Sequence, residues 1–346
     1  MDRLEKEHEL LGILRRIAPG TPLRSAIDDV AKAKLGALIV VGNSQEILNI
    51  VNGGFEVNCK FTPQKLVELC KMDGAVVLDD DLKKIIFANT LLVPNHNIPT
   101  NETGTRHKAA ERTAKQTGNM VIAISERKGK ITVYSSGIKY VLRDSQEILH
   151  RAGETLRMLE KHKEIFNELL MNLNVLEFTN LVSLNDVVLV LQRLEIISRM
   201  DEIIRKYVLE LGTEGSLVKM QLKEIKKGLD NEEMLILKDY SRREALATKI
   251  LLSELSLDEL IEPMNIVKIL GYNEINDRVV TKGFRILSKT DMTREDMEAL
   301  IQKMEYFQAI SESKEAVEEV IGREKAETLM QELSLLKEQA MLGKKI

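Results

Sequence analysis

An acidic motif and a basic motif in the first third of this sequence could together carry out chemistry on a phosphorylated substrate. Asp73-Gly74-Ala75 places a carboxylate and a glycine directly before an apolar run, and Gly104-Thr105 is followed by Arg106-His107-Lys108. A carboxylate can hold a metal ion that activates a hydroxyl group. Backbone N–H groups, a hydroxyl and basic side chains at the start of a helix form a phosphate site. These two motifs predict a nucleotide site.

The basic motif is informative because of its expected place in a helix. Residues 105–117 have a helical pattern that ends at Gly118, so Arg106-His107-Lys108 would occupy the first turn. The N-terminus of a helix carries positive partial charge, and cations there are unfavourable unless an anion lies in front of them. A solvated first turn is the alternative, but such a turn normally prefers acids. Thr105 can also act as the N-cap.

Other polar groups have simpler explanations. Asp73 alone could be a turn residue that caps a hairpin, and the basic motif favours the functional reading. Gly53-Gly54 resembles a phosphate loop but lacks a following Lys-Ser/Thr, so we expect a plain turn. Asp79-Asp80-Asp81 could be a metal cluster, although a hairpin turn explains it more simply. Among the remaining histidines, His96 has the best claim to a role because its loop precedes the basic motif.

Composition limits the class of protein. The chain has 346 residues, room for two or three domains, and its net charge of −4 does not indicate a nucleic-acid binder as a whole. Cys59 and Cys70 are its only cysteines, which argues against a disulfide framework and a cysteine-based zinc site. The charged N-terminal sequence and the lack of a long apolar run predict no signal peptide, no membrane span and a cytoplasmic location.

The first 145 residues alternate between helical and strand patterns. The apolar run 36–42 is bounded by glycines, which is typical of a buried strand. Thr62-Pro63 has the composition of a helix start, with Thr62 as N-cap. We therefore predict an α/β domain with a central, partly antiparallel sheet. Its expected helices are 2–17, 24–34, 63–71 and 105–117, and its expected strands are 36–42, 75–78, 84–88, 121–125, 130–134 and 139–142.

The pattern becomes helical from Ser145 to about Tyr240, and we interpret this region as a connector or oligomerisation spine. Pro263 is expected to break the helical run, and several short helices are expected over 271–346. The segment 319–326, with a turn at Ile321-Gly322-Arg323, resembles the second half of a helix-hairpin-helix unit. The apolar stripes consist of Leu156, Leu159, Ile165, Leu169 and Leu170, and of Leu189, Leu191, Leu194, Ile197, Ile203, Ile204 and Val208.

Asp73-Gly74-Ala75 and the basic triplet resemble the Asp-Gly-Ala and Arg-His-Arg signatures of the diadenylate cyclase family. The stretches 19–24, 36–42 and 71–75 are similar to members that also carry a helical spine and a C-terminal helix-hairpin-helix domain. The resemblance implies three domains: an α/β cyclase domain with a central mixed sheet flanked by helices (1–145), an all-α helical spine (146–262) and a helix-hairpin-helix DNA-binding domain (263–346).

The resemblance also implies an activity. Two ATP molecules would be condensed into cyclic di-AMP with release of two pyrophosphates, with Mg²⁺ or Mn²⁺ as cofactor. The protein would form a homo-octamer in which two cyclase domains face each other, and each 3′-hydroxyl would attack the opposite α-phosphate. The expected DNA partners are branched or recombination structures, which connects the protein to DNA damage and repair.

Carried onto this sequence, the resemblance gives each motif a role. Asp73 would bind the metal and help to activate the 3′-hydroxyl, and Arg106, His107 and Lys108 would act in catalysis by binding phosphates. The remaining ATP contacts would come from Gly74, Ala75, Leu92, Gly104, Thr105, Ser125 and Lys128, and the DNA contacts from Gly322, Arg323 and Lys325.

The sequence departs from the family pattern in two places. The triplet ends in Lys108, which keeps the charge of arginine but not its bidentate fork; we expect activity to survive. The C-terminal hairpin reads Val320-Ile321-Gly322 where Gly-apolar-Gly is expected, and residues 277–346 contain 12 Lys and Arg against 14 Asp and Glu. Two alternatives stay open: a DNA-binding scaffold that only senses nucleotide, and a nucleotidyltransferase that acts on a nucleic-acid end.

Overall fold

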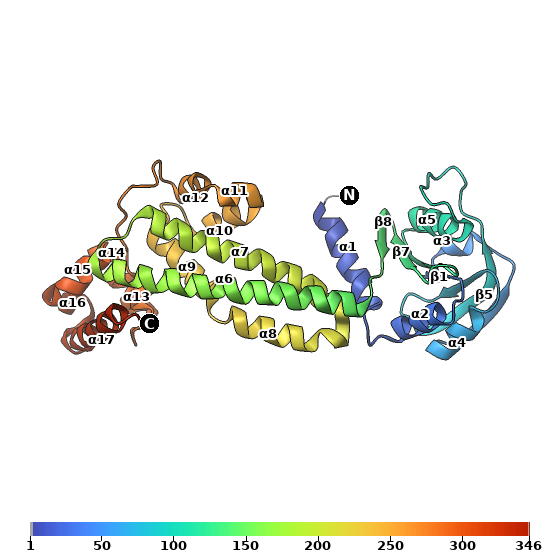
Figure 1. Cartoon of the computed structure of the whole chain (residues 1–346), viewed down its shortest axis with the longest axis horizontal. Coiled ribbons are helices and arrows are strands. Elements are labelled where there is room, and N and C mark those ends of the chain that lie inside the picture. Colours follow the sequence, from blue (N-terminus) through green and yellow to red (C-terminus); the bar gives the residue numbers. More distant parts are fainter. Residues whose placement is uncertain (1–2, 345) are drawn as a thin grey trace. The chain divides into compact units, whose positions relative to one another are not determined.

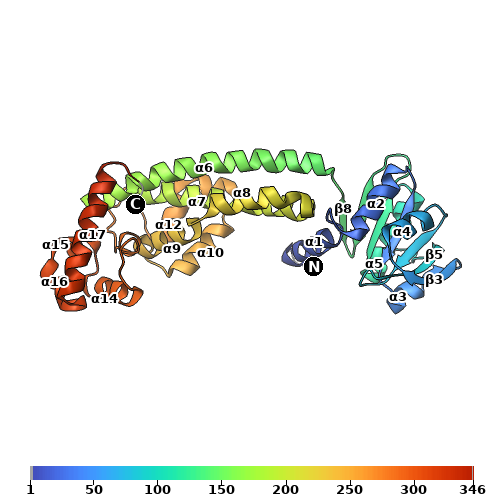
Figure 2. The same cartoon turned by 90° about the horizontal axis from the view of Figure 1, so that it is seen from below.

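The computed structural model describes residues 3–344 and residue 346, with side-chain burial from Glu9 onward. The chain divides into two compact units. The first contains the chain up to Gly153 together with Arg205–Lys219, and the second contains Glu154–Ile204 and Met220–Ile346. Figures 1 and 2 show that the first unit is built around a sheet and that the second is helical.

Over the described residues, eight strands form one mixed sheet in the first unit. Its order is β2-β5-β4-β1-β6-β7-β8, with β3 paired to β5. β1 and β4 are parallel, and the other pairs are antiparallel. The strands are β1 (Ala37–Val41), β2 (Val51–Asn52), β3 (Phe55–Lys60), β4 (Ala75–Leu78), β5 (Lys84–Leu92), β6 (Met120–Ile124), β7 (Ile131–Ser135) and β8 (Ile138–Val141).

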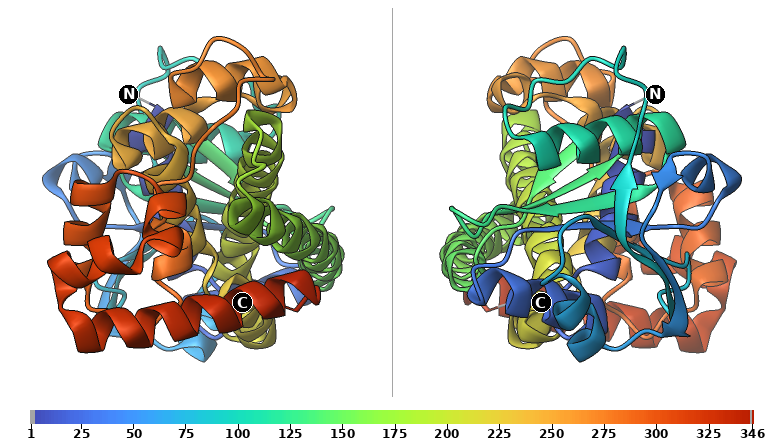
Figure 3. Two further views of the ribbon diagram at one scale, coloured as in Figure 1. Left: turned by 90° about the vertical axis from the view of Figure 1, so that its left-hand side faces the viewer. Right: turned by 90° about the vertical axis from the view of Figure 1, so that its right-hand side faces the viewer.

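Helices cover both faces of this sheet, which explains why every residue of β1, β4 and β6 is buried. Ile39 and Val76 pack on the side of α1 (Arg3–Arg16), α2 (Pro22–Lys32) and α4 (Pro63–Leu69). Val40 and Val77 pack on the side of α3 (Gln45–Leu48) and α5 (Thr105–Thr117). Figure 1 shows α3 and α5 on one side of the sheet and α2 and α4 on the other, and the right-hand view of Figure 3 shows these layers end-on.

The predicted strands and helices of this domain are confirmed to within a few residues. Thr62 is the N-cap of α4, where its hydroxyl accepts from the Lys65 N–H at 3.4 Å, and Gly118 ends α5 with a φ of 71°. The expectation of Thr105 as an N-cap is wrong: Gly104 is the N-cap, and Thr105 is the first helical residue. The short elements α3, β2 and β3 were not predicted.

Two long helices, α6 (Ser145–Thr179) and α7 (Leu184–Leu211), confirm the helical pattern after Ser145. Most residues of the two predicted apolar stripes are buried, but Leu189 and Ile203 of the second stripe are 37% and 45% exposed. The expected break at Pro263 is confirmed: one helix ends at Ile261, and Pro263 is the first residue of the next helix. The following helices are η1 (Gly212–Gly215), α8 (Ser216–Lys226), α9 (Leu229–Tyr240), α10 (Ala245–Glu254), α11 (Leu257–Ile261) and α12 (Pro263–Leu270).

The last part of the second unit has its own small core, which includes Ile286, Leu300, Phe307 and Leu329. Gly322, with a φ of 86°, is the single residue between α16 and α17, so the predicted turn lies between two helices. The final helix has 19 residues and is longer than the short helices expected here. These helices are α13 (Phe284–Leu287), α14 (Arg294–Met304), α15 (Phe307–Glu312), α16 (Lys314–Ile321) and α17 (Arg323–Met341).

A search of the described residues for a membrane span finds no helix that combines sufficient length with sufficient apolar character.

Candidate nucleotide site

Strand register brings the acidic motif to a particular edge of the sheet. β1 is parallel to β4 with Leu38 opposite Ala75, and antiparallel to β6 with Ala37 opposite Ile124. Continued by one or two residues, this register places Asp73 and Ser125 on either side of Gly36. Residues that lie far apart in sequence therefore meet where β1 and β4 begin and β6 ends.

Gly74 fixes the approach to this edge. Its φ is +95°, and an added Cβ would lie 2.9 Å from the Asn89 carbonyl carbon and the Thr90 carbonyl oxygen. A side chain would therefore be strained as well as crowded against backbone. Asp73, directly before it, is exposed. Within the described part of the chain its carboxylate has no hydrogen-bond or ion-pair partner, so both oxygens are available to a ligand.

The N-terminus of α5 has the features of an anion site. Gly104 is the N-cap, no side chain caps the helix, and the first internal hydrogen bond runs from the Lys108 N–H to the Gly104 carbonyl at 2.9 Å. The N–H groups of the residues between them have no acceptor within the helix. A helix end of this kind attracts phosphate. Arg106, His107 and Lys108 are half-buried around it.

Arg106 connects this helix end to the sheet edge. An added Cβ on Gly36 would lie 2.1 Å from Nη1 of Arg106, so the guanidinium packs directly over that glycine. The charge of the same guanidinium also affects the pKa of Cys70, three residues before Asp73. Burial raises the pKa of the Cys70 thiol to about 12, and the positive charge of Arg106 opposes this rise. Asp73 and Arg106 thus belong to one region of the surface.

The loop before α5 is held in place by side chains of that helix. The Asn95 N–H donates to Gln116 at 2.8 Å, Arg112 Nε donates to the Ile98 carbonyl at 2.9 Å, and Lys115 Nζ donates to the Pro99 carbonyl at 2.9 Å. The helix therefore positions the chain that leads to its own N-terminus. His96 lies exposed in this loop.

Glu102, two residues before the N-cap, connects the loop to the sheet. It forms an ion pair with Lys139 and accepts from the Tyr134 hydroxyl at 2.9 Å. Burial raises the pKa of Glu102, but these two partners outweigh burial and hold the pKa below its usual value. The ring of His107 packs edge-on against Tyr134, with 6.4 Å between ring centroids.

The surroundings of His107 favour its neutral imidazole. Burial lowers the pKa of its imidazole, the Glu102 carboxylate raises it, and the cations of Arg106, Lys139 and Lys130 lower it. The net pKa lies below the usual value near 6.5. A neutral imidazole can both donate and accept a hydrogen bond.

The other predicted residues differ in their access to a ligand. Ser125 is half-buried. Its N–H donates to the Lys130 carbonyl at 2.9 Å, and its carbonyl accepts from the Gly129 N–H at 2.8 Å. These two bonds close a turn that carries the exposed Lys128. The side chain of Leu92 is 7% exposed and packs in the core, whereas Leu91 is 63% exposed. Leu92 can therefore offer only its backbone to a base.

A divalent metal fits this site only together with substrate. In the described residues no three His, Cys, Asp or Glu side chains gather as a metal site. Asp73 supplies one free carboxylate, and Mg²⁺ is often held by one or two carboxylates together with substrate phosphates. The predicted turn Asp79-Asp80-Asp81 is a hairpin turn, where Asp79 accepts the N–H groups of Lys83 and Lys84 at 2.7 and 2.9 Å.

Two models of known protein families match this chain. Residues 24–139 match the family model described as the DisA bacterial checkpoint controller nucleotide-binding domain, and residues 142–279 match the model described as the DisA bacterial checkpoint controller linker region. The sheet edge and α5 lie within the first match.

Relatives extend this similarity to the full length. The chain is 42% identical to the DNA integrity scanning protein DisA of Clostridium botulinum over 99% of both chains. It is 42% identical to that of Acetivibrio thermocellus over 99% of this chain and 98% of the relative, and 41% identical to that of Clostridioides difficile over 100% of both. The chain belongs to the family of DNA integrity scanning proteins DisA.

Proposed function

We propose that this chain is a diadenylate cyclase that condenses two ATP molecules into cyclic di-AMP and releases two pyrophosphates. One observation carries the proposal: Arg106, at the uncapped N-terminus of α5, packs over Gly36, which the strand register places beside Asp73. Groups that can donate hydrogen bonds to phosphate would thus face the same ligand as a free carboxylate. Family membership supports the same activity.

The residues have distinct roles in this proposal. The α5 N–H groups, Thr105, Arg106 and Lys108 bind the phosphates and stabilise charge on the leaving pyrophosphate. A divalent ion, Mg²⁺ or Mn²⁺, would lower the pKa of the 3′-hydroxyl and offset charge on the α-phosphate. Asp73 would hold it, and neutral His107 would hydrogen-bond to phosphate. Gly74, Ala75 and Leu92 would line the nucleotide with backbone groups, and Ser125 and Lys128 would reach phosphate from the neighbouring turn.

The site supplies half of a symmetric reaction. Each domain offers one free carboxylate and one phosphate-binding helix end, whereas ring closure needs two hydroxyls and two α-phosphates. We therefore propose that two cyclase domains face each other within a homo-octamer. Holding both nucleotides in place contributes up to roughly 7–11 kcal/mol toward the barrier. Light scattering should give the mass of an octamer, and dilution to monomer should abolish turnover.

Product analysis tests the activity. The purified chain is incubated with ATP and either Mg²⁺ or Mn²⁺, and the products are separated and weighed by mass spectrometry. Cyclic di-AMP is the expected product. Unchanged ATP from a folded oligomer would instead favour a scaffold that senses nucleotide, and a non-cyclic product would favour a nucleotidyltransferase that acts on a nucleic-acid end.

We also propose that the C-terminal region, residues 263–346, is a helix-hairpin-helix DNA-binding domain, following a spine over 146–262 and a cyclase domain over 1–145. Gly322 presents the free N–H groups at the start of α17, and Arg323 is exposed. Lys325, however, is paired with Asp296 at 2.7 Å. Asp296→Asn should release this lysine and strengthen binding to branched duplexes, with a salt slope steeper by about 0.9. Arg323→Ala should weaken binding.

A further inference from the structure

Strand β8 contacts two different parts of the first unit through neighbouring residues. Side chains alternate between the faces of a strand, so Lys139 and Tyr140 point to opposite sides of the sheet. Lys139 pairs with Glu102 in the loop before α5. Tyr140 lines a small cavity on the other side, together with Arg143 and Glu210. One short strand therefore contacts both the candidate site and the end of α7.

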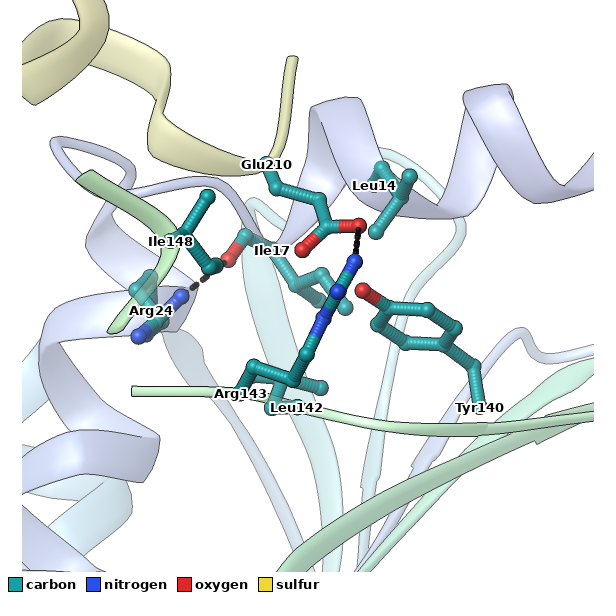
Figure 4. A pocket seen from close by; sticks show the side chains of 8 residues that line it. All are labelled: Leu14, Ile17, Arg24, Tyr140, Leu142, Arg143, Ile148 and Glu210. Atoms are coloured by element: carbon teal, nitrogen blue, oxygen red, sulfur yellow. Dashed lines mark hydrogen bonds and ion pairs between the residues drawn. The ribbon is translucent and has the colours of Figure 1, made fainter. Parts of the chain in front are cut away.

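The contact with α7 is an ion pair between a half-buried arginine and a buried carboxylate. Arg143 Nη2 donates to Glu210 Oε1 at 2.6 Å, and the Arg143 guanidinium also lies 5.7 Å from the ring centre of Tyr207, one turn earlier on α7. Glu210 is 8% exposed. Figure 4 shows the Tyr140 hydroxyl beside this pair, with Leu14 and Ile17 packed around it. A buried carboxylate depends strongly on its partner, so this pair holds the last turn of α7 against the chain that follows β8.

A second contact prevents the end of α7 from moving independently. The Thr213 N–H and hydroxyl donate to the Pro19 carbonyl at 3.1 and 3.3 Å. An added Cβ on Gly20 would lie 2.6 Å from Thr213 Cγ2, so the segment after α7 is closely packed here. Held at Pro19 and at Arg143, this end of the helix cannot shift without displacing the chain that follows β8.

The contact with the site acts directly on the phosphate-binding helix end. Glu102 lies two residues before Gly104, the N-cap of α5, and is held by Lys139 of β8 and by Tyr134 of β7. The same tyrosine packs against His107. Displacement of β8 would therefore move Glu102, the start of α5 and the imidazole together.

We propose that β8 couples the end of α7 to the phosphate-binding end of α5, with Glu102 and Lys139 as positioning residues on one face and Arg143 and Glu210 as their counterpart on the other. The nature of the ligand at α5 rests on the proposed function, but the coupling does not. It requires only that a change at Glu210 reaches His107.

A double-mutant cycle on the full-length protein tests this coupling. Glu210→Gln, Glu102→Gln and the double variant are compared for the affinity of ATP without divalent metal, so that no product forms, and for the NMR signal of the His107 imidazole. Asp81→Asn, which removes an exposed acid of the same domain, is the matched control. Each single variant should weaken ATP binding by about 2- to 30-fold, and the double variant by less than the product of the two.

The His107 signal separates positioning from a general loss of stability. Glu102→Gln should lower the pKa of His107, because the carboxylate raises it, and Glu210→Gln should shift the same signal although it lies on the opposite face of the sheet. If Glu210→Gln unfolds the domain, Tyr140→Phe is used in its place. This variant removes one oxygen atom and should also shift the His107 signal.

The coupling would be overturned if the folded Glu210 or Tyr140 variant left both the His107 signal and the ATP affinity unchanged. It would also be overturned if the losses of ATP affinity in the two single variants multiplied in the double variant. Absence of cyclic di-AMP from the unmodified protein would contradict the proposed function and leave this result unaffected.

Discussion

The guanidinium of Arg106 occupies the space that a side chain at residue 36 would need: an added Cβ on Gly36 would lie 2.1 Å from Arg106 Nη1. This close approach joins the first turn of α5 to the edge of the sheet where Asp73 lies. The proposed site therefore requires glycine at residue 36, because any side chain there would overlap the guanidinium of Arg106.

Gly36→Ala should therefore displace Arg106 and weaken ATP binding while the domain stays folded. Loss of a hydrogen bond to a charged group costs about 1.5–3 kcal/mol, which is about a 10- to 150-fold loss of affinity. Titration calorimetry measures it. Gly137→Ala is the matched control, because nothing lies within 4 Å of an added Cβ there. Equal affinities for the two variants would show that Arg106 does not depend on Gly36.

Lys108 is half-buried in the first turn of α5, where the family pattern has arginine. Lys108→Arg should keep cyclase activity, because it retains the charge and adds a bidentate fork. Lys108→Met should lower turnover by about 10- to 100-fold through loss of a charged phosphate contact. Initial rates of product formation compare the two. Full activity of Lys108→Met would exclude this lysine from phosphate binding.

The sequence predicted most of the strands and helices before residue 145 and the two motifs that the structure brings together. Continuous apolar runs marked β1, β4 and β6 because these strands are buried on both faces. β3 was missed because most of its residues are exposed and polar residues such as Lys60 interrupt its apolar pattern. The distinction between Leu91 and Leu92 was also out of reach, since it depends on which residue of a pair faces the core.

The supporting contacts of the site could not be predicted from sequence. Glu102 and Lys139 are paired by the register of β7 and β8, and Gly36 meets Arg106 through the packing of α5 on β1. No local pattern encodes either pair. What the local pattern did encode was a basic helix start, because cations there are unfavourable without an anion.

The two cysteines should differ in reactivity. Burial raises the pKa of Cys70 to about 12, so this thiol stays protonated at pH 8, and only the thiolate reacts. Cys59 is only half-buried. A thiol reagent at pH 8 should label Cys59 in the native protein and both cysteines in denaturant. Equal labelling of both in the native state would contradict the burial of Cys70.

A buried ion pair in the second unit should be important for stability. The side chains of Glu177 and Arg285 are fully buried, and the Tyr240 hydroxyl donates to Glu177 at 2.6 Å. Arg285→Met should lower the free energy of unfolding by about 3–5 kcal/mol, because it leaves a buried carboxylate without a cation. Urea unfolding measures it, with Arg294→Met, from an exposed pair, as the control. A loss no larger than that of the control would be inconsistent with a buried charge.

The most direct test of the proposed site compares Asp73→Asn with Asp81→Asn in the product assay with ATP and Mn²⁺ or Mg²⁺. Both acids are exposed, and only Asp73 lies at the sheet edge beside Gly36. We predict cyclic di-AMP from the unmodified protein and from Asp81→Asn, and none from Asp73→Asn, with all three equally folded. Undiminished product from Asp73→Asn would contradict the role of this carboxylate and with it the proposed site.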